Sequence, residues 1–85
     1  MTQFGIEVRI TPRQGLLDPQ GQAIQNALRS LAFDAVSDVR VGRLIRLRVA
    51  AENAEAAERA AEAMCRKLLA NPVTEDFAIR VETGS

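Results

Sequence analysis

Three stretches of this chain alternate between apolar and polar residues, and this alternation constrains the fold more than any other feature. Successive side chains of a strand point to opposite faces of a sheet, so such alternation predicts strands with one apolar face each. The first stretch ends at Pro12, because proline cannot donate a hydrogen bond to a neighbouring strand. Its inward residues are Phe4, Ile6, Val8 and Ile10, and its outward residues are Gly5, Glu7, Arg9 and Thr11.

The second stretch runs from Val36 to Val49 and keeps one apolar parity across Gly42 and Arg43. Its inward side chains are Val39, Val41, Ile45, Leu47 and Val49. The preserved parity favours one long bent strand, with a tight hairpin at Gly42-Arg43 as the alternative. The third stretch predicts a last strand with Phe77, Ile79 and Val81 inward and Arg80 and Glu82 outward.

A first helix is predicted to begin at Asp18-Pro19. Aspartate accepts the free N–H groups of a first helical turn, and proline at the first helical position loses no hydrogen bond. Gly21 in this turn weakens a helix, which indicates that another backbone or a ligand comes close. One apolar stripe follows at helical spacing: Ile24, Ala27, Leu28 and Leu31.

A second helix is predicted to begin at Asn53, whose side chain can cap the first turn. It ends at Asn71-Pro72, because the residue before a proline is pushed out of helical geometry. Its apolar face is predicted to comprise Ala54, Ala57, Ala61, Met64, Cys65 and Leu68.

The order of elements predicts an α+β two-layer sandwich, β-α-β(-β)-α-β, with one mainly antiparallel sheet and two helices on one face. A single domain is expected over residues 1–83, with a short tail at 84–85. A chain of 85 residues buries little surface alone, so an oligomer is expected. The other sheet face is either solvated or used by a partner, and it is predicted to carry Glu7, Arg9, Arg40, Leu44, Arg46, Arg48 and Arg80.

Several kinds of catalytic chemistry are excluded by composition. The chain has no histidine, so it cannot form a Ser-His-Asp triad, a Cys-His pair or a histidine metal site. Its one cysteine, Cys65, has a core-like spacing and is interpreted as a buried structural thiol. Glu55, Glu58 and Glu62 follow one helix face, which is typical of a solvated helix rather than of a metal site. We therefore expect no catalytic residue, metal or cofactor in this chain.

The charge balance argues against nucleic acid and membranes as partners. Eleven basic and eleven acidic residues cancel, and no apolar run approaches the length of a membrane span. The three phenylalanines, Phe4, Phe33 and Phe77, fit inward or packing positions, which leaves no aromatic platform for stacking bases. The start, Met1–Gly5, lacks the features of a signal peptide, and a lone thiol fits a cytoplasmic protein.

Two polar segments remain unexplained by the predicted core. The loop from Arg13 to Gly21 opens into a helix N-terminus and could hold an anion, but Asp18 already occupies that positive end, which favours a structural turn or a protein contact. Arg40, Arg43, Arg46 and Arg48 lie within nine residues. Arginine binds carboxylates in a bidentate way, so they indicate either a protein interface or an ordinary solvated strand face.

These segments resemble the PurS family. The similar stretches are Gly15–Ala23, with Leu-Asp-Pro-Gln-Gly, then Asp38–Arg43, and then Leu68–Phe77, with Leu-Leu-Ala-Asn-Pro. The resemblance runs from the first predicted strand to the last. Arg13 and Arg43 stand where the family commonly has lysine. Ala32 stands where glycine often ends the first helix, which implies a less tight turn, and Thr74 replaces a usual aliphatic residue.

The resemblance implies a non-catalytic small subunit of phosphoribosylformylglycinamidine synthase, which acts in the fourth step of purine biosynthesis. The family's large PurL-type subunit uses ATP and Mg, and a PurQ-type glutaminase releases ammonia from glutamine. The small subunit bridges the two, supports ammonia transfer, and forms a dimer or a dimer of dimers. The alternative is a nucleotide-sensing domain that acts at a dimer interface.

Positions in contact with the partners are expected where polar or glycine residues are not required by the predicted core. They are Asp18, Pro19, Gln20, Gly21, Arg40, Gly42, Arg43, Asn71, Pro72, Glu75 and Asp76.

Overall fold

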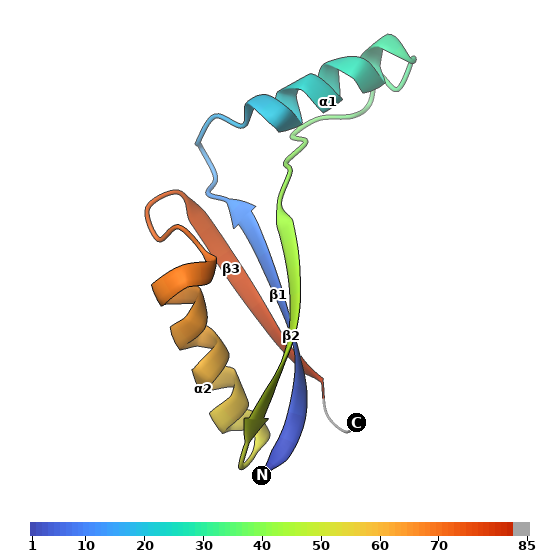
Figure 1. Ribbon diagram of the computed structural model, residues 1–85. Coiled ribbons are helices and arrows are strands. Elements are labelled where there is room, and N and C mark those ends of the chain that lie inside the picture. Colours follow the sequence, from blue (N-terminus) through green and yellow to red (C-terminus); the bar gives the residue numbers. More distant parts are fainter. Residues whose placement is uncertain (83–85) are drawn as a thin grey trace.

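The computed structural model describes residues 1–82, which form three strands, two α-helices and one short π-helical segment (Figure 1). The predicted tail at 84–85 lies outside the described residues, as does residue 83. In chain order the elements are β1 (Thr2–Pro12), α1 (Pro19–Ser30), β2 (Arg43–Ala51), α2 (Ala54–Met64), η1 (Cys65–Leu69) and β3 (Glu75–Glu82).

The three strands form one antiparallel sheet in the order β2-β1-β3. The register places Val8 beside Ile45 of β2 and beside Ile79 of β3, so the apolar faces of the three strands coincide. The predicted α+β class and antiparallel sheet are confirmed. Both β2 and β3 are edge strands of this sheet.

The core lies between α2 and the apolar face of the sheet. The four inward side chains of β1 are buried, with exposed fractions from 0% at Val8 to 7% at Phe4. Burial of a valine or isoleucine side chain contributes roughly 1.5–3 kcal/mol, so β1 supplies much of the apolar stabilisation. Opposite it, Ala57, Ala61 and Cys65 are fully buried, and their small size lets α2 lie close to the sheet. The predicted burial of Cys65 is confirmed.

The end of the second helix departs from the predicted apolar stripe. The helical conformation ends before Asn71, as predicted, but its last five residues, Cys65–Leu69, form a π-helical turn. The wider turn changes the direction in which its own residues point, so Leu69 packs against the core while Leu68 is 83% exposed. The prediction that Leu68 faces the core is therefore wrong.

Helix α1 does not lie on the sheet of its own chain, which corrects the prediction of two helices on one face. Figure 1 shows α1 projecting from the end of the sheet, while α2 lies along it. The stripe of α1 is exposed as a consequence: Ile24 is 42% and Leu31 is 68% accessible. Phe33, predicted to pack inward, is 56% accessible. The helical periodicity correctly predicted that α1 has an apolar side, but it does not determine which surface that side packs against.

The second strand begins at Arg43, so the prediction of one long strand from Val36 is wrong, and so is the alternative hairpin at Gly42-Arg43. Residues 36–42 instead form an irregular connector that returns along α1. The Val39 N–H donates to the Gln25 side chain, and the Val41 N–H donates to Asp18. These side chains of the α1 region take the place of a neighbouring strand as hydrogen-bond acceptors.

Helix α1 ends in a tight turn, contrary to the looser turn expected at Ala32. The Ala32 N–H donates to the Arg29 carbonyl and the Phe33 N–H donates to the Leu28 carbonyl, which is the Schellman arrangement. Ala32 adopts a left-handed φ of 74°, a conformation that favours glycine. The turn is therefore kept despite the substitution, with strain in the backbone.

Candidate functional site

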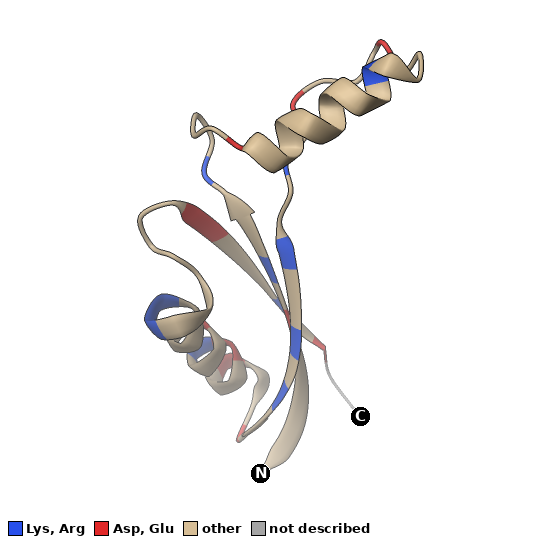
Figure 2. Ribbon diagram, turned by 45° about the horizontal axis from the view of Figure 1, so that its top comes forward, with Lys and Arg blue, Asp and Glu red and all other residues tan. Residues whose placement is uncertain are grey.

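The three motifs that carry the resemblance meet at one end of the sheet, which we call the junction: residues 13–21, 38–43 and 69–76. Here the two connectors of α1 reach β1 and β2, and the turn after η1 leads into β3. Figure 2 shows basic positions in both connectors and the acidic start of β3 beside them. Hydrogen bonds between the two connectors, from the first connector to the turn, and from the start of β2 to the turn hold the junction together.

Asp18 joins the two connectors of α1. Its Oδ1 accepts a hydrogen bond from the Gly21 N–H at 3.1 Å, which caps the helix as predicted. Its Oδ2 accepts from the Val41 N–H at 2.9 Å, 23 residues further along the chain. The hydrogen bond from Val41, followed by that from Gly21, lowers the pKa of the Asp18 carboxyl below its ordinary value. The carboxylate thus occupies the helix N-terminus, where the sequence left an anion site open.

Two glycines of the junction allow close backbone approaches. A Cβ on Gly21 would overlap the carbonyl of Val39, which confirms the prediction that another backbone lies close to this position. A Cβ on Gly42 would overlap the carbonyl of Ile10 on β1. Both glycines are therefore required by the packing of the chain itself.

Arg43 connects β2 to the turn after η1. Its Nη2 donates to the Leu69 carbonyl at 3.1 Å and to Glu75 Oε1 at 2.7 Å. The same Glu75 oxygen accepts from the Asn71 N–H at 2.7 Å. The Asn71 side chain accepts from the Val73 N–H at 2.9 Å, which shapes the turn locally.

Arg13 and Arg40 complete the junction. Arg13 Nη2 donates to the Pro72 carbonyl at 2.6 Å, and its Nε lies 3.5 Å from Asp76 Oδ1. Arg40 Nη1 donates to the Arg13 carbonyl at 2.9 Å, so the first connector is held from both sides.

The junction changes how the predicted contact residues are understood. Their polar and glycine features were ascribed to partners on the premise that the fold does not require them. That premise is wrong for Asp18, Gly21, Arg40, Gly42, Arg43 and Glu75, all of which the fold uses, and the Asn71 and Asp76 side chains also make contacts within the chain. Pro19, Gln20, Asn71, Pro72 and Asp76 are exposed, and contact of any of these residues with a partner stays a prediction.

A pocket beside η1 contains the one thiol of the chain. It is lined by Cys65 and Phe77, and the Arg66 guanidinium lies 5.6 Å from the centre of the Phe77 ring. Burial raises the pKa of the Cys65 thiol, and the nearby Glu62 carboxylate adds to the shift. A buried thiol with a raised pKa is a poor nucleophile.

Glu7 lies on the predicted face of the sheet, but its burial was not predicted. It lies on the sheet face away from α2, as its alternation predicts, yet only 7% of its side chain is exposed. Arg9 Nη2 lies 3.2 Å from Glu7 Oε2, and Arg46 Nη2 lies 3.5 Å from Glu7 Oε1. The arginine side chains that surround Glu7 on the central strand shield it from solvent. A glutamate in one predicted strand and arginines in the others could have indicated this burial. The strand register, however, is needed to show that they are neighbours.

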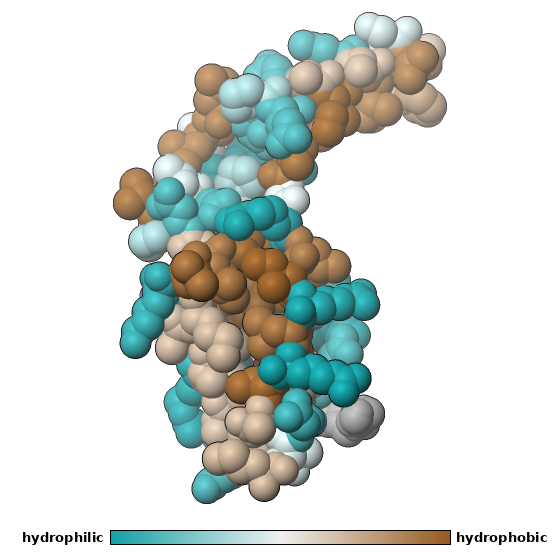
Figure 3. All heavy atoms as spheres, in the orientation of Figure 1, coloured by the Kyte–Doolittle hydropathy of each residue, from teal (hydrophilic) through white to brown (hydrophobic). Residues whose placement is uncertain are grey.

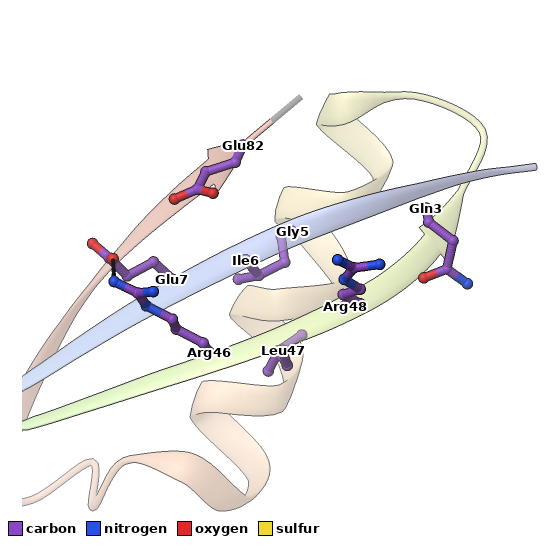
Figure 4. Close-up of a pocket in the computed structure, with 8 residues that line it drawn as sticks. All are labelled: Gln3, Gly5, Ile6, Glu7, Arg46, Leu47, Arg48 and Glu82. Atoms are coloured by element: carbon purple, nitrogen blue, oxygen red, sulfur yellow. Dashed lines mark ion pairs between the residues drawn. The ribbon is translucent and has the colours of Figure 1, made fainter. Parts of the chain in front are cut away.

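A hollow lies next to Glu7 on this face (Figure 4). Gly5 stands at its centre, and the register places Arg48 on one side of Gly5 and Glu82 on the other. Its lining residues are Gln3, Gly5, Ile6, Glu7, Arg46, Leu47, Arg48 and Glu82.

Over residues 1–82, no three histidine, cysteine, aspartate or glutamate side chains gather in a geometry that could hold a metal ion. Within the same range, no helix is long and apolar enough to cross a membrane.

Comparison with known proteins gives consistent matches over nearly the whole chain. Residues 5–83 match the family model PurS, described as phosphoribosylformylglycinamidine (FGAM) synthase. The PurS subunit of this synthase from Methanocaldococcus jannaschii is 43% identical over 75 residues, which cover 88% of this chain and 90% of that protein. The Bacillus subtilis subunit is 38% identical over 79 residues, with 93% of each chain covered.

Solved structures share the fold at similar identity. The crystal structure of M. jannaschii PurS has a TM-score of 0.84 at 39% identity, with 96% of this chain and 99% of that chain covered. A chain in the structure of PurLQS from Thermotoga maritima has a TM-score of 0.87 at 34% identity, with coverage of 96% and 100%. These relatives are all synthase subunits, so the alternative of a nucleotide-sensing domain is not favoured.

Proposed function

This chain belongs to the PurS family of phosphoribosylformylglycinamidine synthase subunits, and from that premise we propose that it is the small, non-catalytic subunit of such a synthase. The assembled enzyme would convert formylglycinamide ribonucleotide to the amidine with ATP and glutamine. The PurL-type subunit would bind ATP and Mg, and the PurQ-type subunit would release ammonia. We propose a cytoplasmic location as well, which the single cysteine of the chain supports.

One observation carries the proposal: the likeness to a PurLQS chain extends over 96% of this chain at a TM-score of 0.87. The chemistry of the described residues supports the same division of labour. The buried Cys65 thiol is a poor nucleophile, and the charged residues of the junction hydrogen-bond to the fold itself. What this chain offers its partners is therefore shape and surface.

The mechanism we propose is positional. Ammonia released into water is protonated and ceases to be a nucleophile. The active sites of the glutaminase and the synthetase therefore have to be held in a fixed relative position. A rigid adapter supplies this by fixing the two active sites relative to each other, which converts a diffusive transfer into a directed one. The junction suits this role because its hydrogen bonds fix the arm formed by α1 relative to the sheet.

Self-association of the chain, as a dimer or a dimer of dimers, is part of the proposal and is supported by the position of α1. Figure 3 shows apolar atoms along α1 and over the sheet beside α2, on either side of a concave surface. The β2 side chains Ile45, Leu47 and Val49 are only half buried there. Helix α1 of a second copy would cover them, and each sheet would then carry two helices on one face.

Such an exchange would bury the apolar side of α1, including Ile24, Leu31 and Phe33, which a single chain leaves exposed. It also supplies the additional burial that a chain of this size needs. The exposed positions Pro19, Gln20 and Asn71 remain accessible for the other subunits, and we propose them as contacts with the synthetase or glutaminase.

Assembly of the purified chain with its two partners tests this function. Size-exclusion chromatography with light scattering should show one complex that contains all three subunits. Replacement of this chain by the variant Gln20→Ala, at an exposed position of α1, should weaken the complex, whereas Lys67→Ala, exposed on η1, serves as the control. Failure of the unmodified chain to join the synthetase and the glutaminase contradicts the proposed function.

A further inference from the structure

The sheet face away from α2 and η1 carries charged side chains from all three strands. The register brings together Glu7 and Arg9 of β1, Arg46 and Arg48 of β2, and Arg80 and Glu82 of β3. We call this surface the open face. It lies on the opposite side of the sheet from the apolar surface that a second copy of α1 would cover.

Both carboxylates of the open face form ion pairs with arginines, whereas Arg48 of the same face does not. Glu7 forms ion pairs with Arg9 and Arg46, and Glu82 Oε1 lies 3.7 Å from Arg80 Nη2. Arg48 forms no ion pair and no side-chain hydrogen bond with any residue of the range 1–82. Arg48 lines the same hollow as Glu7, whose carboxylate already pairs with two other arginines. The Arg48 guanidinium is therefore positioned to bind a hydrogen-bond acceptor from another molecule.

The hollow at Gly5 gives access to this guanidinium. Arg48 and Glu82 flank Gly5 in register, and the missing side chain at Gly5 leaves the space between them open. Figure 4 shows the Arg48 guanidinium beside Gly5, with the amide of Gln3 nearby and Glu82 across the strand.

We propose that this hollow is a docking site for an acidic side chain, an aspartate or a glutamate, of a protein subunit that binds the open face. Arg48 would hold the carboxylate in a bidentate way, and Glu82 would face a basic residue of the same partner. The inference rests on the proposed function, because it takes the synthetase or the glutaminase as the source of that side chain.

The charge pattern favours a protein over a phosphate ligand. Glu7 and Glu82 line the hollow together with Arg46 and Arg48, and Arg46 is paired with Glu7. The two carboxylates repel a doubly charged phosphate more than a singly charged carboxylate, and a protein can also place a base opposite Glu82. Tracking of a nucleic-acid backbone requires a continuous basic surface, whereas the carboxylates of Glu7 and Glu82 interrupt the arginines of the open face. Mixed charges with prominent arginines are typical of protein interfaces.

Charge substitutions at Arg48 test the inference. Arg48→Glu reverses the charge, and Arg48→Gln removes it while keeping a polar side chain, so a folding defect of the first variant does not decide the result. Arg59→Glu is the matched control, because Arg59 is exposed on α2, on the other side of the sheet. The dissociation constant between each variant and the two partner subunits is measured at 50 and 300 mM salt, and the oligomeric state of each variant is measured by light scattering.

We expect Arg48→Glu to weaken assembly about tenfold or more and Arg48→Gln by less, with a smaller salt dependence than the unmodified chain and an unchanged oligomeric state. Assembly that is unaffected by both variants, or equally weakened by Arg59→Glu, overturns the inference and leaves the proposed function standing. Dissociation of the oligomer by Arg48→Glu would make a second copy the occupant and also overturn it. So would binding of ATP or a single-stranded oligonucleotide that Arg48→Gln abolishes. If the unmodified chain does not assemble at all, the proposed function fails first.

Discussion

At the scale of single residues, the junction shows how a few polar atoms set the direction of a helix. Asp18 accepts one N–H from the start of α1 and another from the returning connector, so one carboxylate fixes both connectors. Gly21 lets the Val39 carbonyl come close to the same turn. The sequence predicted the cap at Asp18 and the close approach at Gly21, because both follow from the rules of helix starts. It could not identify Val39 and Val41 as the contacts, since these lie about twenty residues away in the chain.

The pH dependence of stability should report on Asp18. Its pKa is lower in the folded chain than in the unfolded chain, so its stabilising effect is complete above about pH 4 and is lost as the pH falls through the folded value. In Asp18→Asn an amide replaces the oxygen that accepts from Val41. We expect the difference in unfolding free energy between the unmodified chain and this variant to shrink between pH 6 and pH 2. Urea unfolding at each pH measures it, and a constant difference would contradict the role of the carboxylate.

Ala32 offers a stabilising substitution. Its left-handed φ of 74° costs an alanine roughly 1 kcal/mol, which glycine avoids. Ala32→Gly should therefore raise the unfolding free energy by about 0.5–1 kcal/mol in urea titrations followed by circular dichroism. The control is Ala27→Gly, inside α1, where the same change should lower stability by about 1 kcal/mol. A destabilised Ala32→Gly variant would argue against the observed turn.

At the scale of elements, the local sequence pattern predicted which helices and strands exist, but not where the second strand begins or where the first helix packs. The starts of both helices and the apolar alternation of all three strands followed from capping residues and periodicity. The π-helical turn at η1 and the irregular connector 36–42 did not, because each depends on contacts with distant segments. Both helices carry an apolar side, but only α2 covers the sheet of its own chain (Figure 1). The α1 side is the better evidence for a second copy, since its own chain leaves it uncovered.

A charge on the apolar side of α1 should therefore disrupt self-association. Ile24→Glu places a carboxylate on that side, and burial of an unpaired charge is strongly unfavourable. We expect the dissociation constant of the oligomer to rise about a hundredfold in sedimentation equilibrium. Asn26→Glu, on the opposite side of the same helix, should leave it nearly unchanged. Equal self-association of both variants would exclude α1 as the element that joins the copies.

At the scale of the whole molecule, the sequence predicted the class of the fold and the family, whereas the structure was needed for the surfaces. The strand order β2-β1-β3 places Glu7 between Arg46 and Arg80 of the two edge strands. It also places Gly5 between Arg48 and Glu82. No single stretch of sequence contains that arrangement, because it combines three strands that are far apart in the chain. One face of the sheet is not covered by a helix, and the position of α1 beyond the end of the sheet leaves its apolar side exposed. We propose a different neighbour for each of these two surfaces.

The most direct measurement compares two ammonia sources in the reconstituted synthase, with and without this chain. Rates of amidine formation are recorded with glutamine and, separately, with ammonium at a pH where free ammonia is abundant. The account predicts that omission of the chain lowers the glutamine-driven rate about tenfold or more, because the two active sites are no longer held together, while the ammonium-driven rate persists. A glutamine-driven rate that is the same without the chain would contradict the claim that it couples the two subunits.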